Sequence, residues 1–551
     1  MRRTASWACA ALAMVMGQAQ NTAGLLVVNG RIWTGEPARP WAEALAARGE
    51  RLVAVGSEQE ARRATGGGPR VIDARGRMVT PGFIDSHLHL LEGGFRLTAV
   101  QLREARSRQE FVDRIARYAG KLAEGAWVTG GDWDHENWGG QLPQRNWIDP
   151  VTPHNPVWVK RLDGHMGLAN SLALKAAGVT RETPDPDGGA IVRDDKGEPT
   201  GVLKDNAMTL VERVKPEPGS ESKDAAMEAA MRHVAGDGIT SVHHMGSWAD
   251  LEVFERARRA GRLRTRVYAA VPLATWERLR DRVRTTERGD GWLRTGLLKG
   301  FVDGSLGSRT AAFDEPFPGT PQDRGLLVNP PERLHEWIRG ADAAGLHVAV
   351  HAIGDRANRI LLDIYEKVAA ENGPRDRRFR IEHAQHLSKP LVERLARAGV
   401  IASMQPYHAI DDGRWAEKVI GAERLPGMYM FASLLERRAH MAFGSDWFVA
   451  PPSVAMGLYA AVTRRTLDGK NTGGWVPREK IDVEAALRAY TAGGAYASFE
   501  EKEKGTLAPG KLADFVILNK DVTRLRGEEL QDVKVDMTAV GGQIVYERQD
   551  R

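Results

Sequence analysis

Short apolar runs alternate with longer segments of helical periodicity through the middle of the chain. Helical spacing of apolar positions marks residues 224–236 and 390–399, and an apolar run follows each of them, at 238–246 and 400–406. Strand-like runs that alternate with helices are typical of parallel βα units. The pattern therefore predicts an α/β fold built on a parallel sheet.

The two ends of the chain show a different rhythm. Residues 24–79 consist of short strand-like runs separated by turns, and Asn29-Gly30 predicts a hairpin between two of these runs. A similar rhythm returns near the end of the chain, around Gly541-Gly542. We expect residues 24–79 and 500–551 to pair into one small β-sandwich domain beside the main sheet.

Six side chains suited to metal binding stand at or just after the predicted strands of the middle region. They are His87, His89, Lys299, His351, His383 and Asp446. Enzymes that fold as a (β/α)8 barrel take their catalytic residues from the carboxyl ends of several strands. The arrangement predicts a TIM-like (β/α)8 barrel over residues 80–499, with a metal site at the ends of its strands.

Residues from about 95 to 220 interrupt the alternation. They are rich in Trp, Gly, Asp and Pro, for example at 130–140 and 183–199. A long segment without the βα rhythm is expected to be an insertion. We place this insertion over the mouth of the barrel.

Each of the candidate ligands also has a purely structural interpretation. His87 and His89 face the same side of a strand, as a metal pair needs, but such pairs also occur in cores and on surfaces. His351 and His383, about one βα repeat apart, could each be a hydrogen-bonded structural histidine. Asp446 could cap a helix or a turn instead of binding metal and accepting a proton from water.

Lys299 is flanked by apolar residues, so a charged ammonium there would be costly and its pKa should fall. A neutral amine can react with CO2 to give a carbamate, which is a carboxylate able to bridge two cations. The alternative is an ordinary lysine in a salt bridge near Asp303.

Composition narrows the classes of function. Hydrophobic residues make up 42% of the chain and charged residues 27%, as in ordinary globular proteins. The 77 Lys and Arg against 72 Asp and Glu give a net charge of +5, a mild bias over 551 residues. The sequence contains no basic run of the kind that indicates a nucleic-acid partner. No internal segment approaches the roughly 18 apolar residues of a membrane span.

The first 19 residues have the pattern of a secretory signal. Arg2 and Arg3 precede an apolar stretch at 5–16, and Gly17-Gln18-Ala19 is a small-x-small cleavage site. The alternative is a short buried helix. Cleavage predicts a periplasmic or secreted protein, and it removes the only cysteine, Cys9. Any metal must then be held by nitrogen and oxygen donors.

Seven blocks, in order along the chain, resemble the amidohydrolase superfamily, and within it amidohydrolase family 3, the YtcJ-like and N-substituted formamide deformylase-like branch. The blocks lie at 79–90, 161–174, 301–313, 350–357, 380–385, 444–454 and 505–518. The resemblance covers nearly all of the chain after the signal, and the joint match in order is highly specific.

The resemblance implies a centre of one or two zinc ions. With two ions, His87, His89 and Asp446 would hold one, and His351 and His383 the other. A hydroxide and a lysine carboxylated at position 299 would bridge the two. The pair at residues 243–244 departs from the family's pattern, because both are histidines, and could add a ligand.

The chemistry expected of such a centre is hydrolysis by a metal-activated hydroxide. Zinc lowers the pKa of bound water from about 15.7 towards about 7 and polarises a carbonyl. Asp446 would take the proton and pass it to the departing amine. His165 would donate to the developing oxyanion, and Arg309 would clamp a carboxylate or carbonyl. A polar loop contact and a structural ion pair are the respective alternatives.

Three tryptophans near the proposed mouth are candidates for an apolar substrate pocket, although core packing is an equal alternative. They are Trp133, Trp138 and Trp447. They favour a substrate with an apolar or aromatic substituent on nitrogen.

The predicted function is hydrolysis of a C–N bond in an N-substituted amide or formamide, a small-molecule substrate. One alternative is a single-metal deaminase, or an esterase or lactonase, with the same centre. Another is a non-catalytic periplasmic binding protein. We expect no nucleic-acid partner and no membrane span. A homodimer is one possible oligomeric state.

Overall fold

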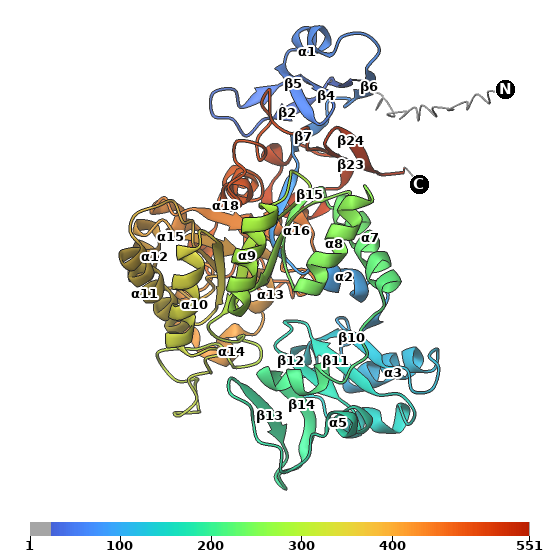
Figure 1. Ribbon diagram of the computed structural model, residues 1–551, viewed down its shortest axis with the longest axis vertical. Helices are drawn as coiled ribbons and strands as arrows, with labels where there is room; N and C mark the ends of the chain where they lie inside the picture. The colour runs from blue at the N-terminus through green and yellow to red at the C-terminus, as the bar shows by residue number, and fades with distance from the viewer. Residues whose placement is uncertain (1–23, 550–551) are drawn as a thin grey trace, which may run out of the picture.

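Eight parallel strands form a nearly closed barrel in the middle of the computed structural model, which describes residues 24–549 (Figure 1). The strands are β8 (Phe83–Leu88), β15 (Ile239–Met245), β16 (Arg266–Pro272), β17 (Leu293–Phe301), β18 (His347–Ala352), β19 (Arg380–His383), β20 (Ile401–Met404) and β21 (Met441–Phe443). They follow one another in sequence order around the sheet. The predicted (β/α)8 barrel is confirmed. The predicted signal at 1–19 lies outside the described residues.

Helices that follow the strands pack on the outside of the barrel (Figure 1). They include α7 (Ser220–Gly236), α8 (Trp248–Arg259), α9 (Trp276–Thr286), α10 (Pro331–Ala343), α11 (Asp355–Asn372), α12 (Lys389–Arg397), α16 (Val454–Thr463) and α17 (Val483–Ala489). The sequence sets their limits locally. In α12, Leu391, Val392 and Leu395 form the buried face, and α8 begins at a capping box made by Ser247 and Asp250.

The two ends of the chain meet in a pair of sheets at one end of the barrel (Figure 1). The first contains β1 (Leu25–Val28), β4 (Ala44–Arg48), β5 (Arg51–Gly56) and β6 (Arg70–Asp73), and the second contains β2 (Arg31–Trp33), β3 (Trp41–Ala42), β7 (Met78–Pro81), β22 (Phe515–Leu518), β23 (Val535–Val540) and β24 (Gln543–Glu547). β7 pairs with β22, which joins the two ends. Val27 and Leu45 of the first sheet share a core with Phe515 of the second.

The predicted hairpin at Asn29-Gly30 is wrong. β1 pairs with β4 and β6, whereas β2 pairs with β3 and β7, so the chain crosses from one sheet to the other at this turn. Asn29 has φ 52°, which the turn requires. Asn29-Gly30 does form a turn, as predicted, but the strands on its two sides belong to different sheets. At Gly541-Gly542, by contrast, β23 and β24 do pair antiparallel.

The insertion between β8 and β15 has a six-stranded sheet of its own (Figure 1, bottom). Its strands are β9 (Val100–Gln101), β10 (Val128–Trp133), β11 (Val157–Arg161), β12 (Met166–Ala169), β13 (Gly189–Arg193) and β14 (Pro199–Asp205). Together with α3 (Arg108–Ala119) it encloses a separate core around Phe111, Ile115 and Trp133. The loop after β11 reaches the carboxyl ends of the barrel strands, where the ring of His165 lies 5.0 Å from that of His351.

None of the helices within residues 24–549 combines the length and apolar character needed to cross a membrane.

Candidate metal centre

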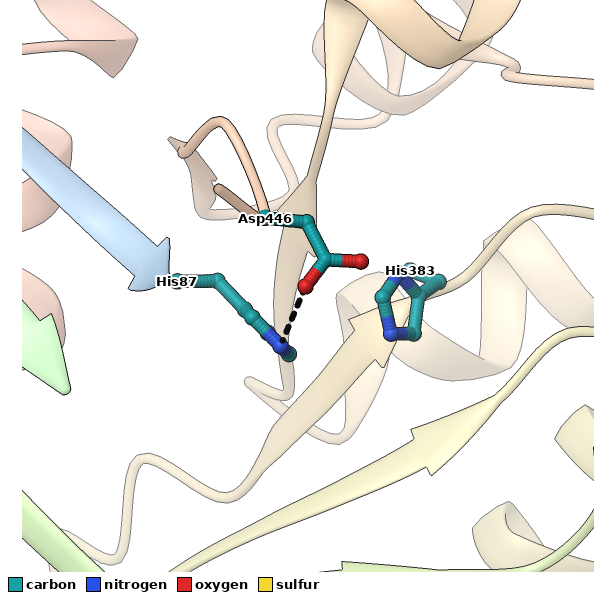
Figure 2. Close-up of side chains that lie close together, drawn as sticks. All are labelled: His87, His383 and Asp446. Carbon is teal, nitrogen blue, oxygen red and sulfur yellow. Dashed lines mark ion pairs between the residues drawn. The ribbon is translucent and has the colours of Figure 1, made fainter. Parts of the chain in front are cut away.

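The predicted ligands converge at the carboxyl end of the barrel. Figure 2 shows His87, His383 and Asp446 facing one another, and one ligand atom from each lies within 4.8 Å of the others. Oδ1 of Asp446 is 3.4 Å from Nε2 of His87 and 3.2 Å from Nε2 of His89. The rings of His351 and His383 are 4.6 Å apart between centroids. The barrel thus brings together side chains from four strands.

Three of the histidines use one ring nitrogen to bind a protein acceptor, which leaves the other nitrogen for the centre. The pairs are His87 Nδ1 with Glu382 Oε2 at 2.5 Å, His383 Nδ1 with Gln405 Oε1 at 2.8 Å, and His351 Nε2 with the Gly304 carbonyl at 2.9 Å. Each acceptor fixes which nitrogen carries the proton. Metal-binding histidines are held in this way, because the acceptor orients the ring and raises its basicity.

Protonation states also suit a cation. Burial lowers the pKa of His87 to about 4 and the pKa values of His351 and His383 well below the usual 6.5, so these imidazoles are neutral at pH 7. Burial acts to raise the pKa of Asp446, but the surrounding histidines hold it well below 3.8. Neutral imidazoles and an ionised carboxylate are the forms that bind metal.

A buried carboxylate oxygen without a good hydrogen bond also indicates that the site fits a divalent cation. Oδ1 of Asp446 is buried and lacks a well-formed hydrogen bond. A buried oxygen left in this state is costly unless a partner supplies positive charge. The backbone is held in the left-handed region at His383, with φ 75°, and at Asp446, with φ 59°. Such conformations at non-glycine residues cluster at functional sites.

Lys299 belongs to the same cluster. Its side chain extends from β17 and places Nζ 3.2 Å from Nε2 of His87. Only 6% of the residue is exposed. Burial lowers the pKa of Lys299 to about 8, although Glu382 and Asp446 oppose this shift. The amine is therefore much more often neutral than that of an exposed lysine.

A buried ion pair inside the barrel, between Arg380 and Glu382, holds His87 in place. Nε of Arg380 lies 2.8 Å from Oε1 of Glu382, and neither side chain is exposed. Burial would raise the pKa of Glu382, but Arg380 and His87 bring it down to about 2. The ionised carboxylate holds His87 by its other oxygen.

Substituting Glu382→Gln is expected to lower the free energy of unfolding by about 3–5 kcal/mol, because the Arg380 charge stays buried without an anionic partner. Glu393→Gln is the matched control. Its pair with Arg437 is more than half exposed on both sides, and we expect a change below about 1 kcal/mol. Denaturant unfolding checks both variants, and equal losses would show that the internal pair does not stabilise the barrel.

Two cavities meet at the centre. One of about 650 Å³ extends past His89 and Lys299 towards the insertion, and one of about 60 Å³ lies between Arg161, Gln385 and Trp415. His351, His383 and Asp446 line both, so a small molecule can reach the centre.

The comparisons with known proteins agree with this geometry. The sequence pattern of the amidohydrolase family matches residues 70–546. The chain belongs to this family. N-substituted formamide deformylase of Arthrobacter pascens is 30% identical over 542 residues, which are 95% of this chain and 98% of that protein. Protein LONG AFTER FAR-RED 3 of Arabidopsis thaliana is 42% identical over 539 residues, 95% of this chain and 92% of that one.

A solved structure has the same architecture. It is the crystal structure of an uncharacterized metal-dependent hydrolase from Pyrococcus horikoshii OT3, with 28% identity and a TM-score of 0.75. The match covers 92% of this chain and 99% of that one. The predicted resemblance is confirmed, and the protein is a metal-dependent hydrolase of the amidohydrolase superfamily.

Among the predicted substrate contacts of this family member, His165 lies at the centre and lines both cavities. Its Nδ1 is 2.6 Å from Oδ1 of Asp205. Burial alone would lower the pKa of His165, but the bond to Asp205 and the charges of Asp205 and Asp163 raise it above 6.5. His165 is therefore an imidazolium more often than an ordinary histidine.

The structure does not bring Arg309 to the centre. Its guanidinium binds the Thr320 hydroxyl at 3.0 Å and lies over the Phe317 ring, and it lines neither cavity. The residue has φ 56°, which turns the chain away after the Gly/Ser loop. The arginine at the small cavity is instead Arg161, which pairs with Asp163 at 2.7 Å.

The predicted tryptophan pocket is also wrong. Trp133 is fully buried in the core of the insertion, and Trp138 packs against that core. Trp447 packs against the His233 ring beside the barrel, outside both cavities. The aromatic residue at the small cavity is Trp415.

The extra histidines on β15 are not arranged as ligands. His244 accepts a hydrogen bond from the Leu90 amide at Nδ1 and approaches Asp250 through Nε2 at 3.2 Å, so both of its nitrogens have protein partners. His243 faces the barrel interior, where Nδ1 accepts from Arg380.

Glu382 is the important residue that the sequence argument missed. A signal was present, because Arg380 and Glu382 stand two apart in a short strand. Both then point to the same face of a sheet that is buried on both sides, and charges in such a place must pair.

Proposed function

We propose that the protein hydrolyses a carbon–nitrogen bond of an N-substituted amide or formamide, with zinc at the centre. The observation that carries the proposal is the convergence of His87, His383 and Asp446 in a cavity, with His89, His351 and Lys299 around them. Nitrogen and oxygen donors at this spacing suit zinc. The relative from Arthrobacter pascens, a deformylase of N-substituted formamides, supports the substrate class.

A bound cation supplies Lewis acidity, which acidifies water and polarises a carbonyl. The chain's own residues do the remaining work. Asp446 accepts the proton of the attacking water at its carboxylate and transfers it to the nitrogen of the departing amine. His165, charged more often because of Asp205, donates to the oxygen on which negative charge develops. No side chain has to form a bond to the substrate.

Lys299 is proposed to carry a carbamate. The neutral amine attacks CO2, a nitrogen–carbon bond forms, and one proton is released. The low pKa and the burial of the side chain favour this product. The resulting carboxylate would point to the same centre as His87.

The test is a hydrolysis screen with N-substituted formamides, N-acyl amino acids, lactones and aminopurines. We expect release of the amine from formamides or other amides. Turnover of lactones alone would replace the proposed reaction by ester hydrolysis, and ammonia released from aminopurines alone would replace it by deamination.

Export to the periplasm or the medium is part of the proposal. It depends on the charge, apolar stretch and cleavage site of residues 1–19. The mass of the protein purified from its native host tests it, because cleavage after residue 19 removes those residues.

A further inference from the structure

A third cavity, with a strongly positive lining, lies at the opposite end of the barrel from the metal centre. It has a volume of about 220 Å³ and lies among the loops that lead into β17, β18 and β19. His347 lines it, and His351 lies four residues further along β18, about 13 Å away at the rise of a strand. The cavity is therefore separate from the hydrolytic site.

Four arginines line this cavity against one carboxylate. The arginines are Arg288, Arg294, Arg375 and Arg377, and the carboxylate is Asp376. Asp376 does not neutralise them, because it pairs with Arg378 at 2.9 Å. The lining thus has an excess of positive charge.

The carboxylates that pair with these arginines are too few to remove the excess of positive charge. Nε of Arg375 and Nε of Arg377 both bind the one buried carboxylate of Asp342, at 3.0 and 3.1 Å. Arg294 lies 3.3 Å from Glu500, which also pairs with Lys504 at 2.9 Å. In both cases two cations share one anion.

Arg288 has the greatest unused capacity. One of its nitrogens donates to the Gly345 carbonyl at 2.5 Å, and it forms no ion pair among residues 24–549. A guanidinium has five N–H donors in a planar fork that matches a carboxylate or a phosphate. Its neighbour Arg377 is only 8% exposed, so water screens that charge poorly.

The floor of the cavity is aromatic and hydrogen-bonded. The Tyr268 hydroxyl lies 3.2 Å from Nδ1 of His347, and Nε2 of His347 donates to the Arg378 carbonyl at 2.7 Å. These contacts hold the floor rigid. They supply no negative charge to the arginines.

From these observations we propose that the cavity binds a small oxyanion, a phosphate or carboxylate group carried by a soluble molecule. Its size admits inorganic phosphate or a short dicarboxylate. The arginine forks would bind the oxygens through charge-assisted hydrogen bonds. The site is an accessory one and takes no part in bond cleavage.

The experiment is calorimetric titration of the metal-loaded protein with inorganic phosphate and, separately, with succinate, at constant ionic strength set by chloride. We expect Arg288→Gln to weaken binding of the preferred anion by about tenfold or more, the usual effect of losing a charged hydrogen bond. Arg258→Gln is the control, since Arg258 is an exposed arginine already paired with Asp290 at 2.7 Å. Anion binding at the metal centre is common to all three proteins and cancels in the comparison.

Tighter binding of phosphate would identify a phosphorylated ligand, and tighter binding of succinate a dicarboxylate. Equal affinity in the wild type and Arg288→Gln, or no binding of either anion, would overturn the proposal. Arg288→Gln is expected to keep its hydrolytic activity, so this result is independent of the proposed reaction.

Discussion

Asp446→Asn is expected to lower kcat/KM for amide hydrolysis by at least about 10³-fold. The carboxylate is proposed both to bind the cation and to accept the proton of the attacking water, and loss of a general base alone costs about 10²–10⁴-fold. The amide of Asn is neutral, does not take up a proton at neutral pH and binds a divalent cation more weakly. The exchange keeps the size of the side chain, so the fold should persist.

The control is Asp281→Asn, an aspartate on the outer helix α9 whose side chain is 61% exposed. Its activity should match the wild type. Steady-state kinetics, together with the thermal unfolding midpoint, separate a chemical defect from a folding defect. Full activity of Asp446→Asn would remove this residue from the mechanism.

Lys299→Arg is expected to cost about 10²-fold or more in activity, at the upper end of the losses caused by groups that support a metal site. Arginine keeps the positive charge but forms no carbamate, because its guanidinium stays protonated. A group with a pKa of about 8, as burial gives Lys299, is roughly 10% neutral at pH 7, compared with less than about 0.1% at a pKa of 10.5. At a fixed concentration of dissolved CO2, carbamate formation should therefore rise as the pH increases through 8.

Labelling tests this directly. Protein equilibrated with ¹³C-bicarbonate should show one carbamate resonance in ¹³C NMR, which Lys299→Arg lacks. Lys418→Arg, at a side chain that is 61% exposed, should retain it. An active wild-type protein without the resonance would mean that an unmodified lysine is present at the centre.

The barrel and the convergence of the candidate ligands could be predicted from sequence because both depend on local patterns. A strand buried on both faces is a short apolar run, and the polar residue that ends it marks the mouth of the barrel. His87, Lys299, His351 and His383 all lie where that argument places them. Parallel strands in sequence order then bring these positions together without further information.

The failures concern contacts between distant parts of the chain. The Asn29-Gly30 turn was visible, but the choice of β4, β6 and β7 as pairing partners depends on the assembled sandwich. Arg309 follows a glycine-rich loop whose path no periodicity describes. From the sequence, Trp133 could face either the cavity or a core. It is buried in the core because the insertion forms a sheet of its own, which the sequence did not predict.

Glu382 lies between these cases. Its charge in a buried strand could have been recognised, but its partners come from residues 87 and 380, and only the closed barrel shows that one carboxylate serves both. The sequence shows that this carboxylate needs a charged partner, but it does not show the distances that identify the partners.

The most direct measurement is the metal content of the purified protein set against its activity. We predict about one to two equivalents of zinc per chain, loss of hydrolysis when a chelator removes the metal, and recovery when zinc is added back. We also predict that the His87→Ala, His383→Ala double variant holds less than a tenth of the wild-type metal. Protein without a metal ion that stays active in the presence of the chelator would contradict the account.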